Sequence, residues 1–310
     1  MSETSPAVRV RGLVKSYRDV SAVRGIDLDI HQGEIFALLG PNGAGKTTTV
    51  EILEGYRKRD GGEVLVLGHD PGRERAKIMP RVGIVLQKTG LDPYLTVTET
   101  VRLFGRYYPR PRRAEDVIDL VGLSEKRNAR VTTLSGGQQR RLDAAVALVG
   151  DPDLLFLDEP TTGFDPSARR EAWEVVKSLA SLGKTVLLTT HYMDEAQYLA
   201  DRVAVIAAGQ IVAEGPPATI GHRDLGVARI RFRLPDGAVL PDGTMPPSQS
   251  PATSVNGFTE IASDDLVADL HRLTSWALDS GITLDGLEVT RPSLEDVYLR
   301  LTGDPEGISE

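Results

Sequence analysis

The stretch from Gly40 to Thr48 constrains this chain of 310 residues more than any other part of its sequence. It reads GPNGAGKTT, it follows the apolar run Ile35–Leu39, and a helix-forming segment continues from Thr48 to Leu53. In this context of strand, loop and helix, glycines let successive backbone N–H groups face a polyphosphate, and the helix N-terminus adds a partial positive charge. The stretch therefore predicts an α/β fold that binds a nucleoside triphosphate.

The side chains of this loop have separate expected roles. Lys46 is expected to reach the β- and γ-phosphates, and the hydroxyl of Thr47 is expected to bind Mg²⁺. The alternative, a glycine-rich turn before an ordinary helix, fits less well because the strand and the helix are both in place. The loop residues predicted to bind the nucleotide are Gly40, Pro41, Asn42, Gly43, Ala44, Gly45, Lys46, Thr47 and Thr48.

Composition limits the classes of function. A chain of this length exceeds the size at which one hydrophobic core stops growing, so we expect two units. The net charge of −8 argues against a nucleic-acid surface, and the absence of cysteine excludes disulfides, thiolate metal sites and cysteine nucleophiles. No apolar run approaches the ~18 residues of a membrane span, and the first residues lack an apolar signal core. We expect a cytosolic chain unless a partner holds it at a membrane.

Two residues near the loop have open roles. Tyr17, upstream of it, either stacks on the nucleobase or is a half-buried strand tyrosine. Gln87 follows a second apolar run, at residues 82–86. The carboxyl ends of strands in an open α/β sheet are where ligands bind, so Gln87 either binds Mg²⁺ or the attacking water, or only caps the strand.

Two further apolar runs end in residues that suit hydrolysis. Residues 154–157 lead into Asp158 and Glu159, and residues 185–190 lead into His191. We expect Asp158 to hold Mg²⁺ and Glu159 to act as general base for the attacking water. His191 ends a predicted core strand, so we expect it near the phosphates.

Residues 90–150 are helical in pattern, and separate the two halves of the predicted sheet. Within them, residues 106–113 form a basic, proline-broken loop that is either a solvated connection or a partner contact. Ser135, Gly136 and Gly137 open the last helix and form a second anion-binding helix N-terminus. Because one nucleotide site seldom needs two such devices, we infer that this one serves the nucleotide of a second copy.

The segment LSGGQ, from Leu134 to Gln138, resembles the signature motif of ATP-binding cassette (ABC) ATPases. The other landmarks of that family are present in order, and the resemblance covers about residues 7–220. These landmarks are the phosphate loop, Gln87 in the Q-loop, the pair Asp158 and Glu159, Asp165 in the D-loop, and the switch histidine His191.

The resemblance implies a P-loop NTPase ABC cassette over residues 1–220. Its RecA-like core would carry an antiparallel β subdomain and a helical subdomain at about residues 90–150. Two copies would form a head-to-tail dimer around two ATP molecules, and this homodimer would keep both sites competent. Implied roles are trans contacts from Ser135, Gly136, Gly137 and Gln138, Mg²⁺ binding by Thr47, Gln87 and Asp158, and catalysis by Glu159, His191 and Lys46.

Three longer sequence segments indicate a subfamily of ABC ATPases. LSGGQQRRLD, DEPTTGFDPSARR and PSLEDVYL are similar to drug-resistance exporter ATPases of the daunorubicin/doxorubicin type. That likeness implies export of a drug, lipid or other hydrophobic substrate through separately encoded permease subunits, with this chain at the inner face of the cell membrane. The alternative is a soluble ABC ATPase acting on ribosomes or DNA, which would favour tandem cassettes, a long coiled coil or basic arms.

The last segment, residues 221–310, is predicted to be a small α+β domain. We expect it to stabilise or regulate the dimer, although a passive cover for the cassette is equally consistent with the sequence. Residues 235–257 are rich in Pro, Gly and Ser, which indicates a loop. The expected strands are 228–234, 258–262 and 283–290, and the expected helices are 264–280 and 293–302.

Overall fold

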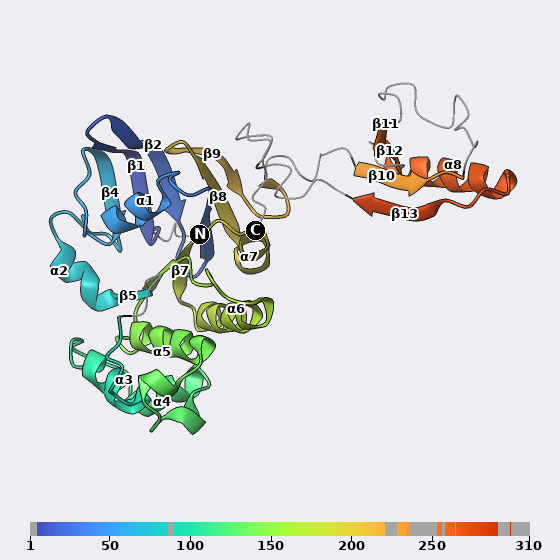
Figure 1. The fold of residues 1–310 in the computed structure, drawn as a ribbon. Helices are drawn as coiled ribbons and strands as arrows, with labels where there is room; N and C mark the ends of the chain where they lie inside the picture. Colours follow the sequence, from blue (N-terminus) through green and yellow to red (C-terminus); the bar gives the residue numbers. More distant parts are fainter. Residues whose placement is uncertain are drawn as a thin grey trace. The chain divides into compact units, whose positions relative to one another are not determined.

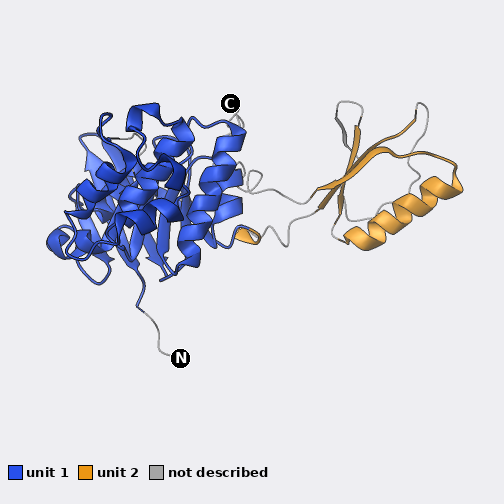
Figure 2. Ribbon diagram, turned by 90° about the horizontal axis from the view of Figure 1, so that it is seen from below, with its two compact units in different colours: residues 1–217 blue, residues 218–310 orange. Residues whose placement is uncertain are grey.

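The computed structural model describes residues 5–85, 90–220, 228–235, 253–255, 258–263, 265–290 and Tyr298. The chain divides into two compact units, residues 1–217 and 218–310 (Figure 2). Among the described residues, no helix has the length and apolar character to cross a membrane.

A six-stranded sheet forms the centre of the first unit (Figure 1). Five strands run parallel, and the sixth returns antiparallel along one edge. Strands buried on both faces need continuous apolar sequence, and β3 and β7 are buried along their whole length. In spatial order the strands are β5 (Val82–Val85), β6 (Leu154–Asp158), β7 (Thr185–Thr190), β3 (Ile35–Leu39), β8 (Arg202–Ala207) and β9 (Gln210–Gly215).

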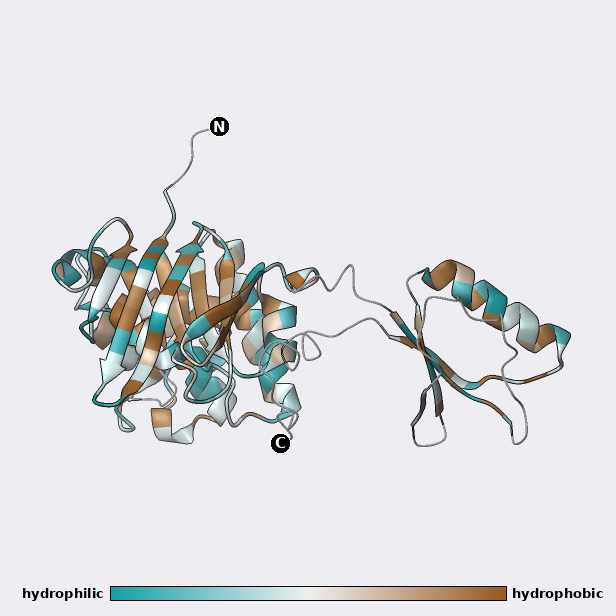
Figure 3. Ribbon diagram, turned by 90° about the horizontal axis from the view of Figure 1, so that it is seen from above, coloured by the Kyte–Doolittle hydropathy of each residue, from teal (hydrophilic) through white to brown (hydrophobic). Residues whose placement is uncertain are grey.

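A second, antiparallel sheet has the order β2–β1–β4. Its strands are β1 (Val8–Tyr17), β2 (Val20–Ile30) and β4 (Gly61–Val66). Apolar side chains from both sheets share one core, which includes Val10 and Phe156. Helix α1 (Lys46–Leu53) contacts both sheets and begins two residues earlier than the sequence indicates. Figure 3 shows apolar residues along the ribbons inside this unit.

Helices inserted between β5 and β6 gather at one end of the unit (Figure 1). The helices α3, α4 and α5 pack against one another, and α5 also contacts β5. The helical pattern expected for residues 90–150 is therefore confirmed. The segments are α3 (Val97–Gly105), α4 (Ala114–Leu120), η2 (Ser124–Lys126), η3 (Val131–Thr133) and α5 (Gly136–Leu148), and before β5 lie α2 (Arg75–Ile78) and η1 (Met79–Arg81).

Two helices complete the first unit, α6 (Pro166–Ser181) and α7 (Met193–Leu199). The α6 helix follows β6 and contacts both β7 and α7. Together, the parallel sheet, the antiparallel sheet and the helical insertion confirm the predicted RecA-like core with its two subdomains.

Among its described residues, the second unit has a four-stranded antiparallel sheet and the helix α8. Its core is formed by Ile230, Phe232, Ile261 and Leu273. The predicted α+β character is confirmed, although the predicted helix 293–302 lies outside the described residues except for Tyr298. The elements are β10 (Ala228–Arg233), β11 (Thr253–Val255), β12 (Phe258–Ser263), α8 (Leu266–Asp279) and β13 (Asp285–Thr290).

The strand β11 corrects the prediction of a loop through residue 257. It pairs with β12, and Val255 faces Phe258 in the register. In the sequence, Asn-Gly stands between the two strands, and this dipeptide is a recognised hairpin signal. The Pro, Gly and Ser content of the preceding residues obscured this local signal.

Candidate nucleotide-binding and catalytic site

Backbone geometry explains the glycines of the phosphate loop between β3 and α1. Gly43 and Gly45 have φ of 81° and 107°, a left-handed region that other residues rarely adopt. A Cβ on Gly40 would lie 2.3 Å from the carbonyl oxygen of Ile206, and one on Gly45 would lie 2.5 Å from that of Ala22. The loop can therefore keep this path only with glycine at these positions.

Lys46 lies folded over the phosphate loop and is 5% exposed. Its Nζ donates to the carbonyl oxygens of Gly40 at 2.7 Å and Pro41 at 3.1 Å. Burial lowers the pKa of the Lys46 ammonium, while the nearby charge of Glu159 opposes the change. Thr47, the next residue, is exposed at the start of α1, so its hydroxyl is accessible.

The parallel register brings the ends of β3, β6 and β7 together. Leu39 pairs with Thr190, and Asp158 pairs with Thr189. The loop after β3, Asp158 at the end of β6 and His191 after β7 therefore meet at one edge of the sheet. This is the edge at which ligands bind in open α/β folds.

Glu159 lies at the centre of this edge. Its carboxylate is 3.6 Å from Lys46 Nζ and 3.3 Å from His191 Nδ1, and it accepts a hydrogen bond of 3.1 Å from the Thr162 hydroxyl. The φ of Glu159 is 45°, a sparsely populated conformation that backbone bonding to Thr189 holds in place. A carboxylate held between an ammonium group and an imidazole suits proton transfer beside a bound phosphate.

Asp158 is held by a neighbouring strand. Its Oδ1 accepts a hydrogen bond of 2.5 Å from the Thr189 hydroxyl. A carboxylate at this position and a hydroxyl at Thr47 are both hard oxygen ligands of the kind that Mg²⁺ prefers. Gln87, the third predicted ligand, lies outside the described residues.

The predicted signature begins α5 with a reciprocal cap. The N–H of Gln138 donates to Ser135 Oγ at 3.3 Å, and the N–H of Ser135 donates to Gln138 Oε1 at 3.0 Å. A Cβ on Gly136 or Gly137 would meet no atom within 4 Å. Among the described residues, no hydrogen bond or ion pair links this helix start to the phosphate loop of the same chain.

Two other predicted residues have structural contacts. Asp165 caps α6, because its Oδ1 accepts from the N–H groups of Ser167 and Ala168 at 2.8 and 3.0 Å. The ring of Tyr17 lies between cations, 5.2 Å from the Arg57 guanidinium carbon and 5.3 Å from Lys15 Nζ. Neither the cap made by Asp165 nor the cations beside Tyr17 tests the functional role predicted for that residue.

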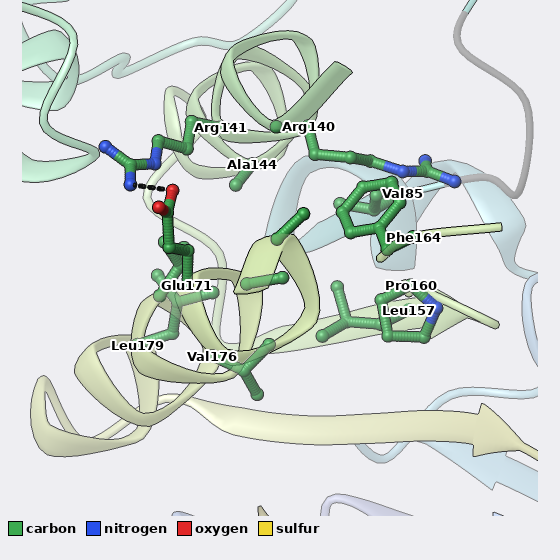
Figure 4. Close-up of a pocket in the computed structure, with 14 residues that line it drawn as sticks. Val85, Arg140, Arg141, Ala144, Leu157, Pro160, Phe164, Glu171, Val176 and Leu179 are labelled. Atoms are coloured by element: carbon green, nitrogen blue, oxygen red, sulfur yellow. Dashed lines mark hydrogen bonds and ion pairs between the residues drawn. The ribbon is translucent and has the colours of Figure 1, made fainter. Parts of the chain in front are cut away.

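An apolar cavity of about 40 Å³ lies beside the site, between α5 and α6 (Figure 4). Pro160 and Phe164, from the turn after Glu159, face it, and Arg141 pairs with Glu171 at 2.7 Å on its lining. The cavity is lined by Gly137 of the signature but by no residue of the phosphate loop.

Sequence reasoning missed three residues around the predicted base, namely Thr162, Thr189 and Glu195. Thr162 donates a hydrogen bond to Glu159 and Thr189 donates one to Asp158, whereas Glu195, in α7, accepts one from Thr161. The paired threonines after DEP were a visible signal for Thr162. Nothing in the sequence alone placed Thr189 beside Asp158, because that contact depends on strand order.

Comparison with known proteins agrees with this architecture. The family model "ABC transporter" matches residues 23–162, and a model for the C-terminal domain of ABC transporter domain-containing protein-like sequences matches residues 228–293. The daunorubicin/doxorubicin resistance ATP-binding protein DrrA of Streptomyces peucetius is 38% identical, over 98% of this chain and 94% of the relative. The Nod factor export ATP-binding protein I of Burkholderia lata is 42% identical, over 94% and 96% of the two chains.

Solved structures resemble the first unit. The ADP conformation of MJ1267, an ATP-binding cassette of an ABC transporter, has a TM-score of 0.62 and 25% identity to this chain. The match covers 69% of this chain and 92% of the MJ1267 chain. A dimeric post-hydrolysis state of the cassette MJ0796, bound to ADP and Pi, has a TM-score of 0.60 and 28% identity, with coverage of 67% and 98%.

Proposed function

The chain belongs to the ATP-binding proteins of ABC transporters, and from that membership we propose that it powers export of a hydrophobic compound through separate membrane subunits. It is an ATP-binding subunit with ATPase activity. We propose the class of substrate, the use of a separate permease and the role of each site residue.

The observation that carries the proposal is the presence of two open anion-binding helix starts in one chain. Gly43 in the phosphate loop and Gly136 and Gly137 in the signature have no atom within 4 Å of an added Cβ. Each helix start offers N–H groups and a partial positive charge to a phosphate. We infer that each signature meets the phosphates held by a second copy, which gives a head-to-tail homodimer around two ATP molecules.

Side chains at this edge of the sheet carry out the hydrolysis of ATP. Lys46 binds the β- and γ-phosphates, and Glu159 accepts the proton of the attacking water. His191 lies 3.3 Å from Glu159 and contacts the γ-phosphate from β7. Tyr17 stacks on the base, and Asp165 in the D-loop caps α6.

The oxygen donors at this edge fit Mg²⁺. Thr47 supplies a hydroxyl and Asp158 a carboxylate whose Oδ1 is fixed by Thr189, and Gln87 is the proposed third ligand. The ion would neutralise charge that develops on the phosphate oxygens. Asp158 and Thr47 would orient it so that Glu159 remains available as the base.

The relatives indicate the direction and kind of transport. Two are named for daunorubicin resistance and several for Nod factor export. We infer that this chain also serves an exporter, and that it lies at the inner face of the cell membrane through the permease. Residues 218–310 would stabilise or regulate the dimer, which a truncation lacking residues 226–310 tests by its ATP-dependent dimerisation.

The test uses Glu159→Gln, which should keep bound ATP intact. Sedimentation of the purified full chain should show monomers without nucleotide and dimers with Mg²⁺ and ATP. Adding Gly137→Asp to that variant should prevent dimerisation, because the new carboxylate would face phosphate, while α5 stays folded with an acidic residue in its first turn. A Glu159→Gln protein that binds ATP but remains monomeric, even with its membrane partner supplied, contradicts the proposal.

A further inference from the structure

Glu195 is a fully buried carboxyl group that the proposed reaction does not use. It lies in α7 and is 0% exposed, which is rare for glutamate unless the group is paired or hydrogen-bonded. Its Oε1 accepts hydrogen bonds from the Thr161 hydroxyl at 2.7 Å and from Trp173 Nε1 at 3.0 Å. One carboxyl group thus joins the turn after β6 to the helices α6 and α7.

The residue next to Thr161 contacts the candidate base. Thr162 donates to Glu159 Oε2 at 3.1 Å, and the N–H of Thr162 donates to the carbonyl oxygen of Glu159 at 3.3 Å. Adjacent threonines therefore hold two different carboxyl groups. Any movement of the backbone at Thr161 would move the hydroxyl that orients Glu159.

The other side of this turn is loosely packed. Pro160 and Phe164 face the apolar cavity between α5 and α6 (Figure 4). Side chains beside a cavity lack packing partners there and lose dispersion contacts. The buried hydrogen bond from Thr161 to Glu195 therefore opposes movement of the turn towards the cavity.

The buried position of Glu195 disfavours its charged form. Burial raises the pKa of the Glu195 carboxyl, while the hydrogen bonds from Thr161 and Trp173 act in the opposite direction. A neutral amide in the same place would accept the same two hydrogen bonds at its oxygen. Glutamine should therefore replace Glu195 without loss, whereas an apolar side chain of similar length should not.

We propose that Glu195 is a positioning residue for ATP hydrolysis: it fixes the turn through Thr161, so that Thr162 keeps Glu159 directed at the γ-phosphate. This inference rests on the role proposed above for Glu159. A residue with this task should affect the chemical step and leave nucleotide binding unchanged.

The test compares Glu195→Met with Glu195→Gln in steady-state ATP hydrolysis. Methionine removes the acceptor, and kcat should fall about tenfold or more, since a misplaced catalytic group costs up to about a hundredfold. The KM for ATP should change less than about threefold, because only the transition state is affected. Glutamine should keep kcat within about threefold of the unchanged protein, as an isosteric acceptor.

Thr161→Val provides a second route if Glu195→Met fails to fold. Valine keeps the shape of threonine without its hydroxyl, so kcat should again fall at constant KM. The double variant should lose no more than either single variant, because the two changes break one interaction. Tyr198→Phe is the matched control, since it removes a hydrogen bond of 2.7 Å to Glu174 between the same two helices, away from the turn.

Normal kcat in folded Thr161→Val, or equal losses in Glu195→Met and Tyr198→Phe, would overturn the inference. If Glu159→Gln itself hydrolyses ATP normally, then the proposed base is wrong and the positioning inference fails with it. If Glu159→Gln is inactive but Thr161→Val is normal, only the positioning role is wrong.

Discussion

Glu54 lies at the end of α1, and the structure predicts that its charge makes stability depend on pH. The residue is 4% exposed. Burial raises the pKa of the Glu54 carboxyl to about 7, with smaller contributions in the same direction from the charges of Asp158 and Glu51, whereas Arg75 lowers it. The perturbation is Glu54→Gln, which keeps the shape and removes the titration.

The sign and size of this pH effect follow from the linkage between proton binding and folding. The folded state binds the Glu54 proton more tightly than the unfolded state, whose carboxyl has its ordinary pKa of 4.5. The contribution of Glu54 to stability is therefore fully present below about pH 4.5, and it is lost as the pH rises through about 7. One pKa unit corresponds to about 1.36 kcal/mol, so ionised Glu54 costs about 3 kcal/mol at pH 8.5, and most of this cost develops above pH 5.

The assay is urea unfolding of the unit that contains Glu54. The chain has two tryptophans, Trp173 in the first unit and Trp276 in the second, so a Trp276→Phe background leaves an emission signal from the first unit alone. In that background, we compare the free energy of unfolding of Glu54→Gln with that of the parent. The difference in favour of the variant should increase by about 2–3 kcal/mol from pH 5 to pH 8.5.

The control is Glu63→Gln, which changes an exposed side chain on β4 of the same unit. As a surface substitution it should alter the free energy of unfolding by less than about 0.5 kcal/mol across the range. A Glu54→Gln difference that stayed constant with pH would refute the reasoning, because the cost would then not come from ionisation of this carboxyl group.

Three other changes have defined outcomes. Glu159→Gln should lower the hydrolysis rate about 10²–10⁴-fold, as expected for a lost general base, while equilibrium ATP binding is kept; near-normal turnover would refute its role. Gly45→Ala should destabilise the first unit by about 1–3 kcal/mol in urea, because alanine is strained at φ 107° and its Cβ would overlap Ala22; unchanged stability would count against that geometry. Thr189→Val should raise the Mg²⁺ concentration for half-maximal ATPase activity about 10–100-fold, since it frees Asp158; an unchanged Mg²⁺ dependence would remove Asp158 from the site.

Much of the cassette could be predicted because its signals are local. Continuous apolar runs predicted the buried parallel strands, and glycine spacing predicted the phosphate loop. Asp158, the last residue of β6, and His191, just after β7, could be placed at one edge because the carboxyl ends of parallel strands coincide. Family resemblance supplied the helical insertion and the role of the signature.

The rest depends on packing between distant segments. The contact between Asp158 and Thr189 needs the order of β6 and β7, and the bond from Thr161 to Glu195 spans 34 positions in sequence. A buried glutamate in a helix looks like a surface residue in sequence, because its partners come from another element. The left-handed φ of Glu159 is likewise a tertiary effect, imposed by Thr189 across the sheet.

The central claim is that each copy completes the ATP pocket of another, and mixing two inactive variants tests it most directly. Lys46→Ala damages only the phosphate loop, and Gly137→Asp damages only the signature. A mixed dimer would contain one pocket with both parts intact, so mixing should restore ATPase activity, at about half of the unchanged activity per mixed dimer if the pockets act independently. A mixture no more active than either variant alone, with mixed dimers demonstrated by tag capture, would contradict the claim.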